Sequence, residues 1–306
     1  MPVIEVRDLR KDYGRLHAVA GVSFEVAEGE VYGLLGHNGA GKTTTVEILE
    51  GHRTRTSGQV SVLGIDPATG GRQLRDRVGI VLQTSGVEPE LCVREAIGLY
   101  GSVYRRRRPI DELLDLVGLD AKADARIGTL SGGQRRRLDL ALGIVGYPDL
   151  VFLDEPTTGF DPAARRKSWE LVQGLCSLGT TVLLTTHYLD EAEQLADRVG
   201  VLTDGRLVAE GTPDDLIAGL ADTIVSFTVA GVDASALDGV VPAGATVQAG
   251  QVRFTTSTPT VDVHRVTAWA VERGVELHAL SVSRPTLEDV FLGLADADPV
   301  TEASAR

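Results

Sequence analysis

Short apolar runs separated by glycine-containing turns open the chain and predict β-strands. These runs lie at Val3–Leu9, Val22–Val26 and Val31–Leu35. Apolar runs of this length that are bounded by turn residues are typical of strands. The loop 36–41 follows the third run, and Lys42–Glu50 then has the composition of a helix. The opening is therefore β-rich, and it ends in a strand, a loop and a helix in succession.

The pattern changes between about residues 85 and 145, where apolar positions recur at spacings of three and four and predict a helical insert. Its helices are expected at Arg94–Tyr104, Ile110–Val117 and Gly132–Ile144. Continuous apolar runs flank the insert and are typical of strands buried in a parallel sheet. These strands are expected at Val78–Leu82, Leu150–Leu153 and Thr181–Leu184, and the last two alternate with helices at Ala163–Ser177 and Leu189–Arg198. This alternation predicts an α/β fold.

A turn at Gly211–Pro213 precedes a segment of different character. Between residues 210 and 306 there are 14 acidic and 5 basic residues. Strands are predicted at Ile224–Val229, Gln251–Thr256 and Glu276–Val282, and helices at Val261–Arg273 and Pro285–Leu294. We expect a first domain over residues 1–215, a small α+β domain over residues 222–295 and a disordered tail over residues 296–306.

The charge and cysteine content narrow the class of protein. Acidic residues outnumber basic ones 43 to 30, for a net charge of −13, which argues against a protein that coats nucleic acid. Two cysteines cannot form a disulfide framework in 306 residues, which favours a reducing compartment. The N-terminus lacks the pattern of a signal peptide, and no apolar run reaches about 18 residues. We therefore expect neither secretion by a signal peptide nor a membrane span.

The segment from Gly36 to Thr43 matches the phosphate-loop pattern G-x-x-x-x-G-K-[ST]. Glycines let successive backbone N–H groups turn toward a phosphate, and the helix that follows directs its positive end there. Lys42 is expected to reach the β- and γ-phosphates of ATP, and Thr43 to bind Mg²⁺. The predicted ATP-binding residues of this segment are Gly36, His37, Asn38, Gly39, Ala40, Gly41, Lys42, Thr43 and Thr44.

Two adjacent carboxylates, Asp154 and Glu155, end the predicted strand at Leu150–Leu153. Ligands of α/β sheets bind outside the carboxyl ends of the strands, and neighbouring side chains of a strand point in different directions. Asp154 is expected to hold Mg²⁺, and Glu155 to polarise the attacking water as a general base.

A second helix start with glycines lies at Leu130, Ser131, Gly132, Gly133 and Gln134. Ser131 is a candidate N-cap, and the glycines would let a phosphate approach the helix end. With Lys42, Asp154 and His187, this LSGGQ segment resembles the ATP-binding cassette (ABC) ATPases over nearly all of residues 1–215.

The resemblance implies a P-loop ABC ATPase core with an N-terminal antiparallel β subdomain, followed by the small α+β domain. It also implies a head-to-tail homodimer that holds two ATP molecules between its subunits. Tyr13 would stack on adenine, His187 would bind the γ-phosphate, and the signature residues Leu130–Gln134 would contact the nucleotide of the other subunit. Gln83 would touch the metal and the attacking water, and Asp161 would cross the dimer interface.

Three basic runs, Arg105–Arg108, Arg135–Arg137 and Arg165–Lys167, are interpreted as solvated helix faces. The first of them is also a candidate for contact with anionic lipid headgroups.

Two classes of function remain open for such a cassette. The first is the energy-coupling subunit of an exporter, bound to two separate permease chains at the cytoplasmic face of the cell membrane. The second is a soluble ABC ATPase that acts on ribosomes or DNA, which the acidic charge disfavours. The segments Gly128–Ala141 and Pro285–Leu292 resemble the daunorubicin-resistance type of subunit. That resemblance implies export of a drug, an antibiotic or a lipid-like cargo, with lipid or polysaccharide export as the alternative.

The α+β domain has two interpretations. One is a module that stabilises the dimer or sets a spacing, and the other is a domain that regulates the ATPase in response to a ligand.

Overall fold

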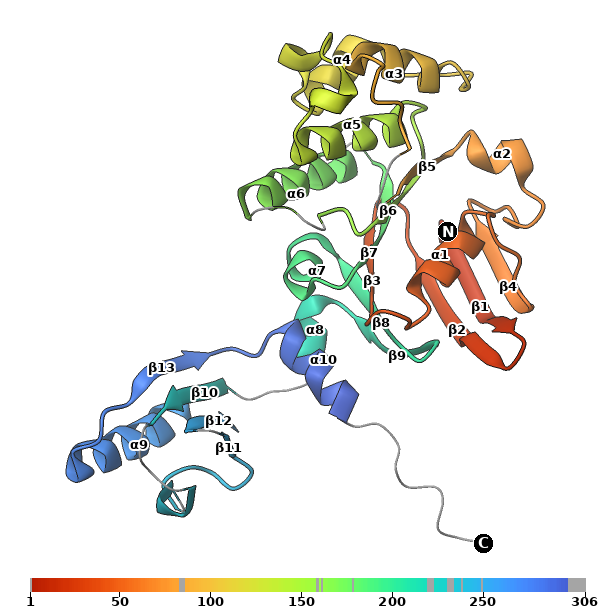
Figure 1. The fold of residues 1–306 in the computed structure, drawn as a ribbon. Helices are drawn as coiled ribbons and strands as arrows, with labels where there is room; N and C mark the ends of the chain where they lie inside the picture. Colours follow the sequence, from red (N-terminus) through yellow and green to blue (C-terminus); the bar gives the residue numbers. More distant parts are fainter. Residues whose placement is uncertain are drawn as a thin grey trace, which may run out of the picture. The chain divides into compact units, whose positions relative to one another are not determined.

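The computed structural model describes residues 2–82, 86–157, 160, 162–177, 179–218, 223–229, 234–237, 239–248 and 250–296. The chain divides into two compact units, Met1–Pro213 and Asp214–Arg306. Figure 1 shows the elements of both units. None of the helices in these described ranges combines the length and the apolar character that crossing a bilayer requires.

A six-stranded sheet forms the centre of the first unit, in the order β5-β6-β7-β3-β8-β9. Its strands are β3 (Val31–Leu35), β5 (Val78–Val81), β6 (Leu150–Asp154), β7 (Thr181–Thr186), β8 (Arg198–Thr203) and β9 (Arg206–Gly211). All neighbouring strands are parallel except β8 and β9. Because β3, β7 and β6 are neighbours, the segments that follow them meet at one edge of the sheet.

The sheet is buried on both faces, which explains the continuous apolar runs of its strands. On β6, Val151 and Leu153 belong to a core shared with the helices α5 (Gly132–Ile144), α6 (Pro162–Ser177) and α7 (Leu189–Leu195). Leu150 and Phe152 belong to a second core, shared with α1 (Lys42–Leu49) and the N-terminal strands. Because successive side chains of β6 point to opposite faces of the sheet, this one strand contributes to two separate hydrophobic cores.

The N-terminal antiparallel sheet has the order β2-β1-β4 and packs against the second core. Its strands are β1 (Ile4–Tyr13), β2 (Leu16–Val26) and β4 (Ser57–Val62). The sequence pattern did not predict β4, which is short and rich in polar residues. Gly58 of β4 has φ +93°, and a Cβ there would lie 2.3 Å from the carbonyl oxygen of Asp8. Only glycine therefore allows the close approach of β4 to β1.

The helical insert contains α3 (Val93–Gly101), α4 (Ile110–Leu116), η1 (Asp120–Lys122), η2 (Ile127–Thr129) and α5, while α2 (Gly71–Arg75) precedes β5. The prediction of α5 matches the structure at both ends, whereas α3 ends at Gly101 rather than at Tyr104. The helix predicted to reach Arg198 also ends early, at Leu195. Asp197 instead exchanges two hydrogen bonds with Val31, both of 2.8 Å, and so starts the pairing of β8 with β3.

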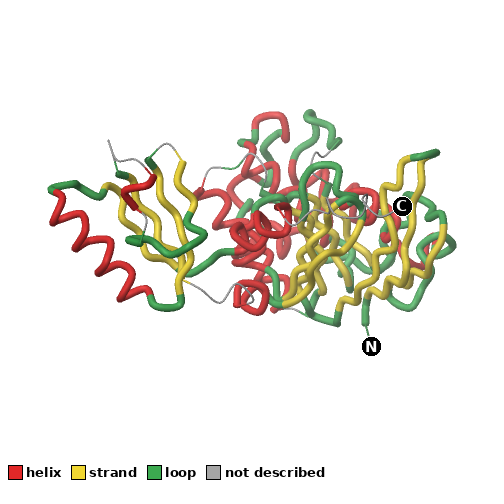
Figure 2. Tube along the Cα trace, turned by 90° about the horizontal axis from the view of Figure 1, so that it is seen from below, coloured by secondary structure: helices red, strands yellow, loops and turns green. Residues whose placement is uncertain are grey.

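The second unit holds a four-stranded antiparallel sheet in the order β11-β12-β10-β13, with the helix α9 alongside it (Figure 2). Its elements are α8 (Pro213–Ala218), β10 (Thr223–Thr228), η3 (Ala234–Leu237), β11 (Thr246–Gln248), β12 (Gln251–Thr256), α9 (Pro259–Arg273), β13 (His278–Ser283) and α10 (Leu287–Asp296). Phe227 and Phe254 of the sheet share a core with Trp269 of α9. The expected tail beyond Asp296 lies outside the described residues.

Candidate nucleotide site

The loop between β3 and α1 can be built only with glycine at two of its positions. A Cβ at Gly36 would lie 2.5 Å from the carbonyl oxygen of Leu202, and one at Gly41 would lie 2.4 Å from that of Ala18. Gly41 also has φ +102°, which disfavours any other residue. Gly39 has φ +88°, which also disfavours any other residue, but it has no atom within 4 Å of its Cβ position and lies on the exposed side of the loop. The two ends of the loop are therefore packed closely against other segments, and its middle is exposed.

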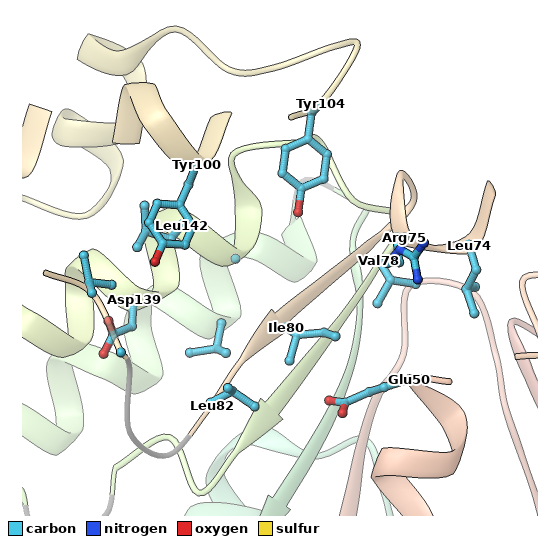
Figure 3. Close-up of a pocket in the computed structure, with 14 residues that line it drawn as sticks. Glu50, Leu74, Arg75, Val78, Ile80, Leu82, Tyr100, Tyr104, Asp139 and Leu142 are labelled. Carbon is cyan, nitrogen blue, oxygen red and sulfur yellow. The ribbon is translucent and has the colours of Figure 1, made fainter. Parts of the chain in front are cut away.

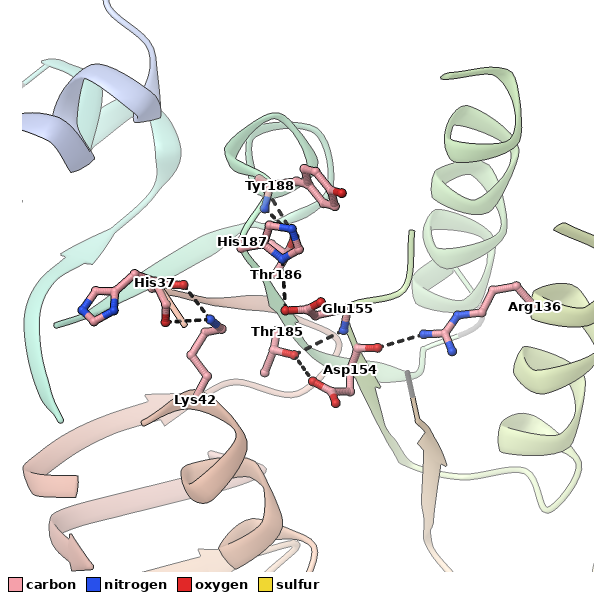
Figure 4. A network of polar contacts seen from close by, with 10 residues as sticks. His37, Lys42, Arg136, Asp154, Glu155, Thr185, Thr186, His187 and Tyr188 are labelled. Atoms are coloured by element: carbon pink, nitrogen blue, oxygen red, sulfur yellow. Dashed lines mark hydrogen bonds and ion pairs between the residues drawn. The ribbon is translucent and has the colours of Figure 1, made fainter. Parts of the chain in front are cut away.

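Lys42 is buried and folds back along this loop. Its Nζ donates to the carbonyl oxygens of Gly36 at 2.5 Å and of His37 at 3.2 Å (Figure 4). Burial lowers the pKa of the Lys42 ammonium, while the charges of Glu155 and Asp154 act in the opposite direction. The cation thus lies between the loop and the two carboxylates that the sequence predicted to act with it.

Asp154 and Glu155 are oriented by Thr185 of the neighbouring strand β7. Thr185 Oγ1 donates to Asp154 Oδ1 at 2.5 Å, and the N–H of Glu155 donates to the carbonyl oxygen of Thr185 at 3.0 Å. Glu155 has φ +44°, a left-handed conformation that costs about 1 kcal/mol or more for a residue with a side chain. Backbone strain of this kind clusters at functional sites. Thr185 therefore fixes the direction of the Asp154 carboxylate and the position of the Glu155 backbone.

His187 follows β7 and pairs with Glu155. The distance from His187 Nδ1 to Glu155 Oε1 is 3.0 Å, and the Glu155 side chain is only 14% exposed. The imidazole ring also lies 4.1 Å from the ring of Tyr188, centroid to centroid. The structure thus brings four of the predicted site residues, Lys42, Asp154, Glu155 and His187, to one edge of the sheet.

Tyr13, the predicted adenine platform, is the last residue of β1 and is half exposed. Arg53 Nη1 donates to its hydroxyl at 2.5 Å, and Arg53 Nε pairs with Glu47 of α1, also at 2.5 Å. Arg53 therefore connects the tyrosine ring to the helix that follows the phosphate loop, and the cations of Lys11 and Arg53 lie 5.0 and 5.5 Å from the centre of the ring.

The signature segment begins α5 with a capping box. The N–H of Gln134 donates to Ser131 Oγ at 3.3 Å, and the N–H of Ser131 donates to Gln134 Oε1 at 2.9 Å. Ser131 and Gly132 are exposed, and a Cβ at Gly132 would meet no atom within 4 Å. Throughout the described part of the chain, no hydrogen bond joins this segment to the phosphate loop. Figure 1 shows α5 in the helical insert, apart from α1, so the two predicted phosphate-binding segments lie on separate parts of the first unit.

The predicted residues Gln83 and Asp161 lie outside the described residues. Thr43 and Thr44 follow Lys42 at the start of α1, where Thr43 is exposed.

The interpretation of the arginine run 135–137 as a solvated helix face is wrong for Arg136. Its side chain is buried and donates to the carbonyl oxygens of Leu82, Asp154 and Pro156. Burial lowers its pKa, and the nearby carboxylates counteract that effect. The sequence did not predict this role, because three consecutive arginines give no sign of which one points inward.

A cavity of about 300 Å³ lies beside the site, between β5 and the helices α3 and α5 (Figure 3). Its walls are mostly apolar, but they include two buried carboxyl groups, those of Glu50 and Asp139. Burial raises the pKa of Glu50 from 4.5 to about 8, and the charges of Asp154 and Glu47 contribute. His52 Nδ1 lies 3.2 Å from the Glu50 carboxylate.

We expect Glu50 to make folding stability fall as the pH rises. Between its ordinary pKa of 4.5 and about 8, the folded chain keeps a proton that the unfolded chain releases. The free energy of unfolding of Glu50→Gln should therefore decline less over this window than that of the wild type, by about 1.4 kcal/mol or more. Urea unfolding between these pH values checks this, with the exposed Glu170→Gln as a control. Equal slopes for wild type and Glu50→Gln would contradict it.

Comparison with known proteins gives matches to both units. Residues 19–158 match a family model described as "ABC transporter", and residues 223–286 match one described as "ABC transporter domain-containing protein-like, C-terminal domain". The daunorubicin resistance ATP-binding protein DrrA3 of Streptomyces coeruleorubidus is 39% identical over 96% of this chain and 96% of its own length. The Nod factor export ATP-binding protein I of Burkholderia lata is 45% identical over 71% of this chain and 74% of its own.

A solved structure shares the fold of the first unit. It is the dimeric ATP-binding cassette MJ0796, in a post-hydrolysis state with ADP and Pi, which is 25% identical and covers 68% of this chain and 98% of its own with a TM-score of 0.61. Fold and site together therefore define an ABC-type ATPase.

The chain belongs to the ATP-binding subunits of ABC transporters, and within them to the daunorubicin-resistance type. It binds and hydrolyses ATP to power transport.

Proposed function

We propose that this chain powers an exporter as a head-to-tail homodimer bound to two separate permease chains at the cytoplasmic face of the membrane. The observation that carries the proposal is the separation of the two phosphate-binding segments. Lys42 lies near enough to Asp154 and Glu155 for their charges to act on its ammonium group. Ser131 and Gly132, by contrast, are exposed at the start of another helix. A second copy could place its Ser131 against the phosphates held by Lys42. The relative MJ0796 was solved as a dimer, which supports this arrangement.

The residues around the loop suit Mg-ATP. The backbone of residues 36–44 and the Lys42 ammonium would hold the phosphates, and the Tyr13 ring would stack on adenine. Mg²⁺ takes few protein ligands beside phosphate oxygens, which fits the exposed Thr43 hydroxyl and the Asp154 carboxylate, with Gln83 completing the set. When bound, the ion would neutralise charge that develops on the phosphates.

Glu155 is the proposed general base. Its carboxylate is largely buried, and the hydrogen bond with His187 fixes the direction of Oε1. A water positioned at the γ-phosphate would give its proton to Glu155 as it attacks. The other ring nitrogen of His187, Nε2, would then contact the γ-phosphate, so that one side chain orients both the base and the reacting group.

The cargo proposed is a drug or another amphipathic small molecule. The Nod factor export protein matches only 71% of this chain, but the daunorubicin resistance protein matches 96% and thus includes the second unit. The names of both relatives refer to proteins that export a compound or give resistance to one. Neither name supports the alternative of action on ribosomes or DNA. For residues 222–295 we propose an accessory domain that stabilises the dimer.

Transport by inside-out vesicles tests this proposal. The chain would be co-expressed with a candidate permease chain, with daunorubicin as the probe. We expect ATP-dependent uptake only when both chains are present, and none with Glu155→Gln. Export is contradicted if the chain remains with ribosomes or DNA on fractionation and its presence does not change uptake.

A further inference from the structure

One buried side chain of the signature helix contacts the ends of two core strands. Arg136 of α5 donates from Nη2 to the carbonyl oxygen of Asp154 at 2.9 Å and from Nε to that of Pro156 at 3.0 Å. Its Nη1 donates to the carbonyl oxygen of Leu82, directly after β5. Figure 4 shows the guanidinium approaching Asp154 from the helix. Arg136 therefore connects the helical insert to the strand ends that carry the carboxylates.

Arginine is suited to this place for geometric reasons. Its planar group has five N–H donors in fixed directions, so that one side chain can bond three carbonyl oxygens at once, whereas lysine presents a single rotating ammonium. The charges of Asp139, Asp154 and Glu191 favour the buried cation. Three hydrogen bonds in fixed directions therefore attach α5 to the segments that follow β5 and β6.

Arg136 also lies one helical turn after the exposed start of the signature segment. It is four positions after Gly132, which is about 6 Å along the helix axis. Ser131 and Gly132 face outward at one end of this turn, and Arg136 holds the Asp154 backbone at the other. A displacement of the start of α5 would thus be transmitted to Asp154 and Glu155 across a single helical turn.

We propose that Arg136 is a positioning residue that couples the two ATP sites of the dimer. When the ATP of the partner subunit contacts Ser131, the shift of α5 is transmitted by Arg136 to the carboxylates of its own subunit. Each site is thereby aligned for hydrolysis by occupancy of the other. This inference rests on the head-to-tail dimer proposed above.

Arg137 supplies a matched control on the same helix. Its Nη1 donates to the carbonyl oxygens of Val117 at 3.0 Å and Gly118 at 2.7 Å, both within the helical insert. Arg137→Gln thus removes a comparable set of bonds without touching β5 or β6.

The test is the ATP dependence of hydrolysis by the full chain. We expect Arg136→Gln to lower kcat about tenfold or more and to bring the Hill coefficient close to one, while the ATP affinity of the single subunit changes less than about twofold. Arg136→Lys should restore part of the cooperativity, and Arg137→Gln should keep the wild-type Hill coefficient. If Arg136→Gln does not fold, the Lys variant is compared with Arg137→Gln in the same way.

Three results would overturn the inference. They are wild-type cooperativity in the folded Arg136 variants, an equal loss in Arg137→Gln, or a loss of ATP affinity that accounts for the whole effect. A wild-type chain that hydrolyses ATP without cooperativity or dimer formation would instead contradict the dimeric function itself. Failure of the coupling and failure of the dimer are thus distinguished.

Discussion

Glu155→Gln should bind ATP normally and form a lasting dimer while hydrolysis falls by about 10²- to 10⁴-fold, the contribution typical of a general base. The amide keeps the size of the side chain and can still bond with His187 at the present 3.0 Å position, but it cannot accept a proton from water. In the proposed site, other groups bind the nucleotide, chiefly the loop and Lys42. The measurements are steady-state phosphate release and the dimer fraction with ATP.

The matched control for this change is Glu170→Gln, which makes the same substitution at an exposed position of α6. It should leave phosphate release unchanged. Rapid hydrolysis by Glu155→Gln would show that another group accepts the proton. Loss of ATP binding would instead show that the Glu155 carboxylate is needed to hold the nucleotide.

Ser131→Arg should abolish hydrolysis and ATP-dependent dimer formation but leave ATP binding by the single subunit intact. Ser131 is exposed at the start of α5, where the proposed dimer places the phosphates of the partner's ATP. An arginine there fills the space that the nucleotide needs. The lost serine cap costs about 1 kcal/mol, which the stability of a folded domain can absorb.

Asp115→Arg is the control, since it places the same side chain on an exposed position of α4 in the helical insert. It should hydrolyse ATP at the wild-type rate. Wild-type turnover by Ser131→Arg would refute the assignment of the signature segment to the nucleotide site. A loss of ATP binding by the single subunit would place Ser131 in the site of its own chain.

The parts of the site that are contiguous in the sequence could be predicted well. The loop around Lys42, the carboxylates after β6 and the helix start at Ser131 each combine a local motif with a local pattern of strand or helix. The resemblance to the ABC ATPases placed His187 at the γ-phosphate, and parallel strands bring their carboxyl ends to one edge of a sheet, so His187 after β7 comes near Glu155 after β6. The structure places them 3.0 Å apart.

The parts that depend on contacts between distant segments could not be predicted. Thr185 orients Asp154 because β6 and β7 pair in a register that sets these two residues side by side. Nothing in the local sequence specifies that register. The raised pKa of Glu50 likewise results from burial against other segments. Arg136 differs from its neighbours only by the direction in which the helix turns it.

Mixing two inactive variants tests the composite site most directly. Lys42→Ala lacks the phosphate-loop cation, and Ser131→Arg blocks the signature segment. In a head-to-tail dimer of the two, one site carries both defects and the other carries neither. We predict that an equal mixture regains hydrolysis well above that of either variant alone, because each mixed dimer has one intact site. The rate of that site should stay below that of a wild-type site, because the partner site holds no ATP to align it through Arg136. If the mixture stays as inactive as its two components while mixed dimers form, each ATP is hydrolysed within a single chain and the account is wrong.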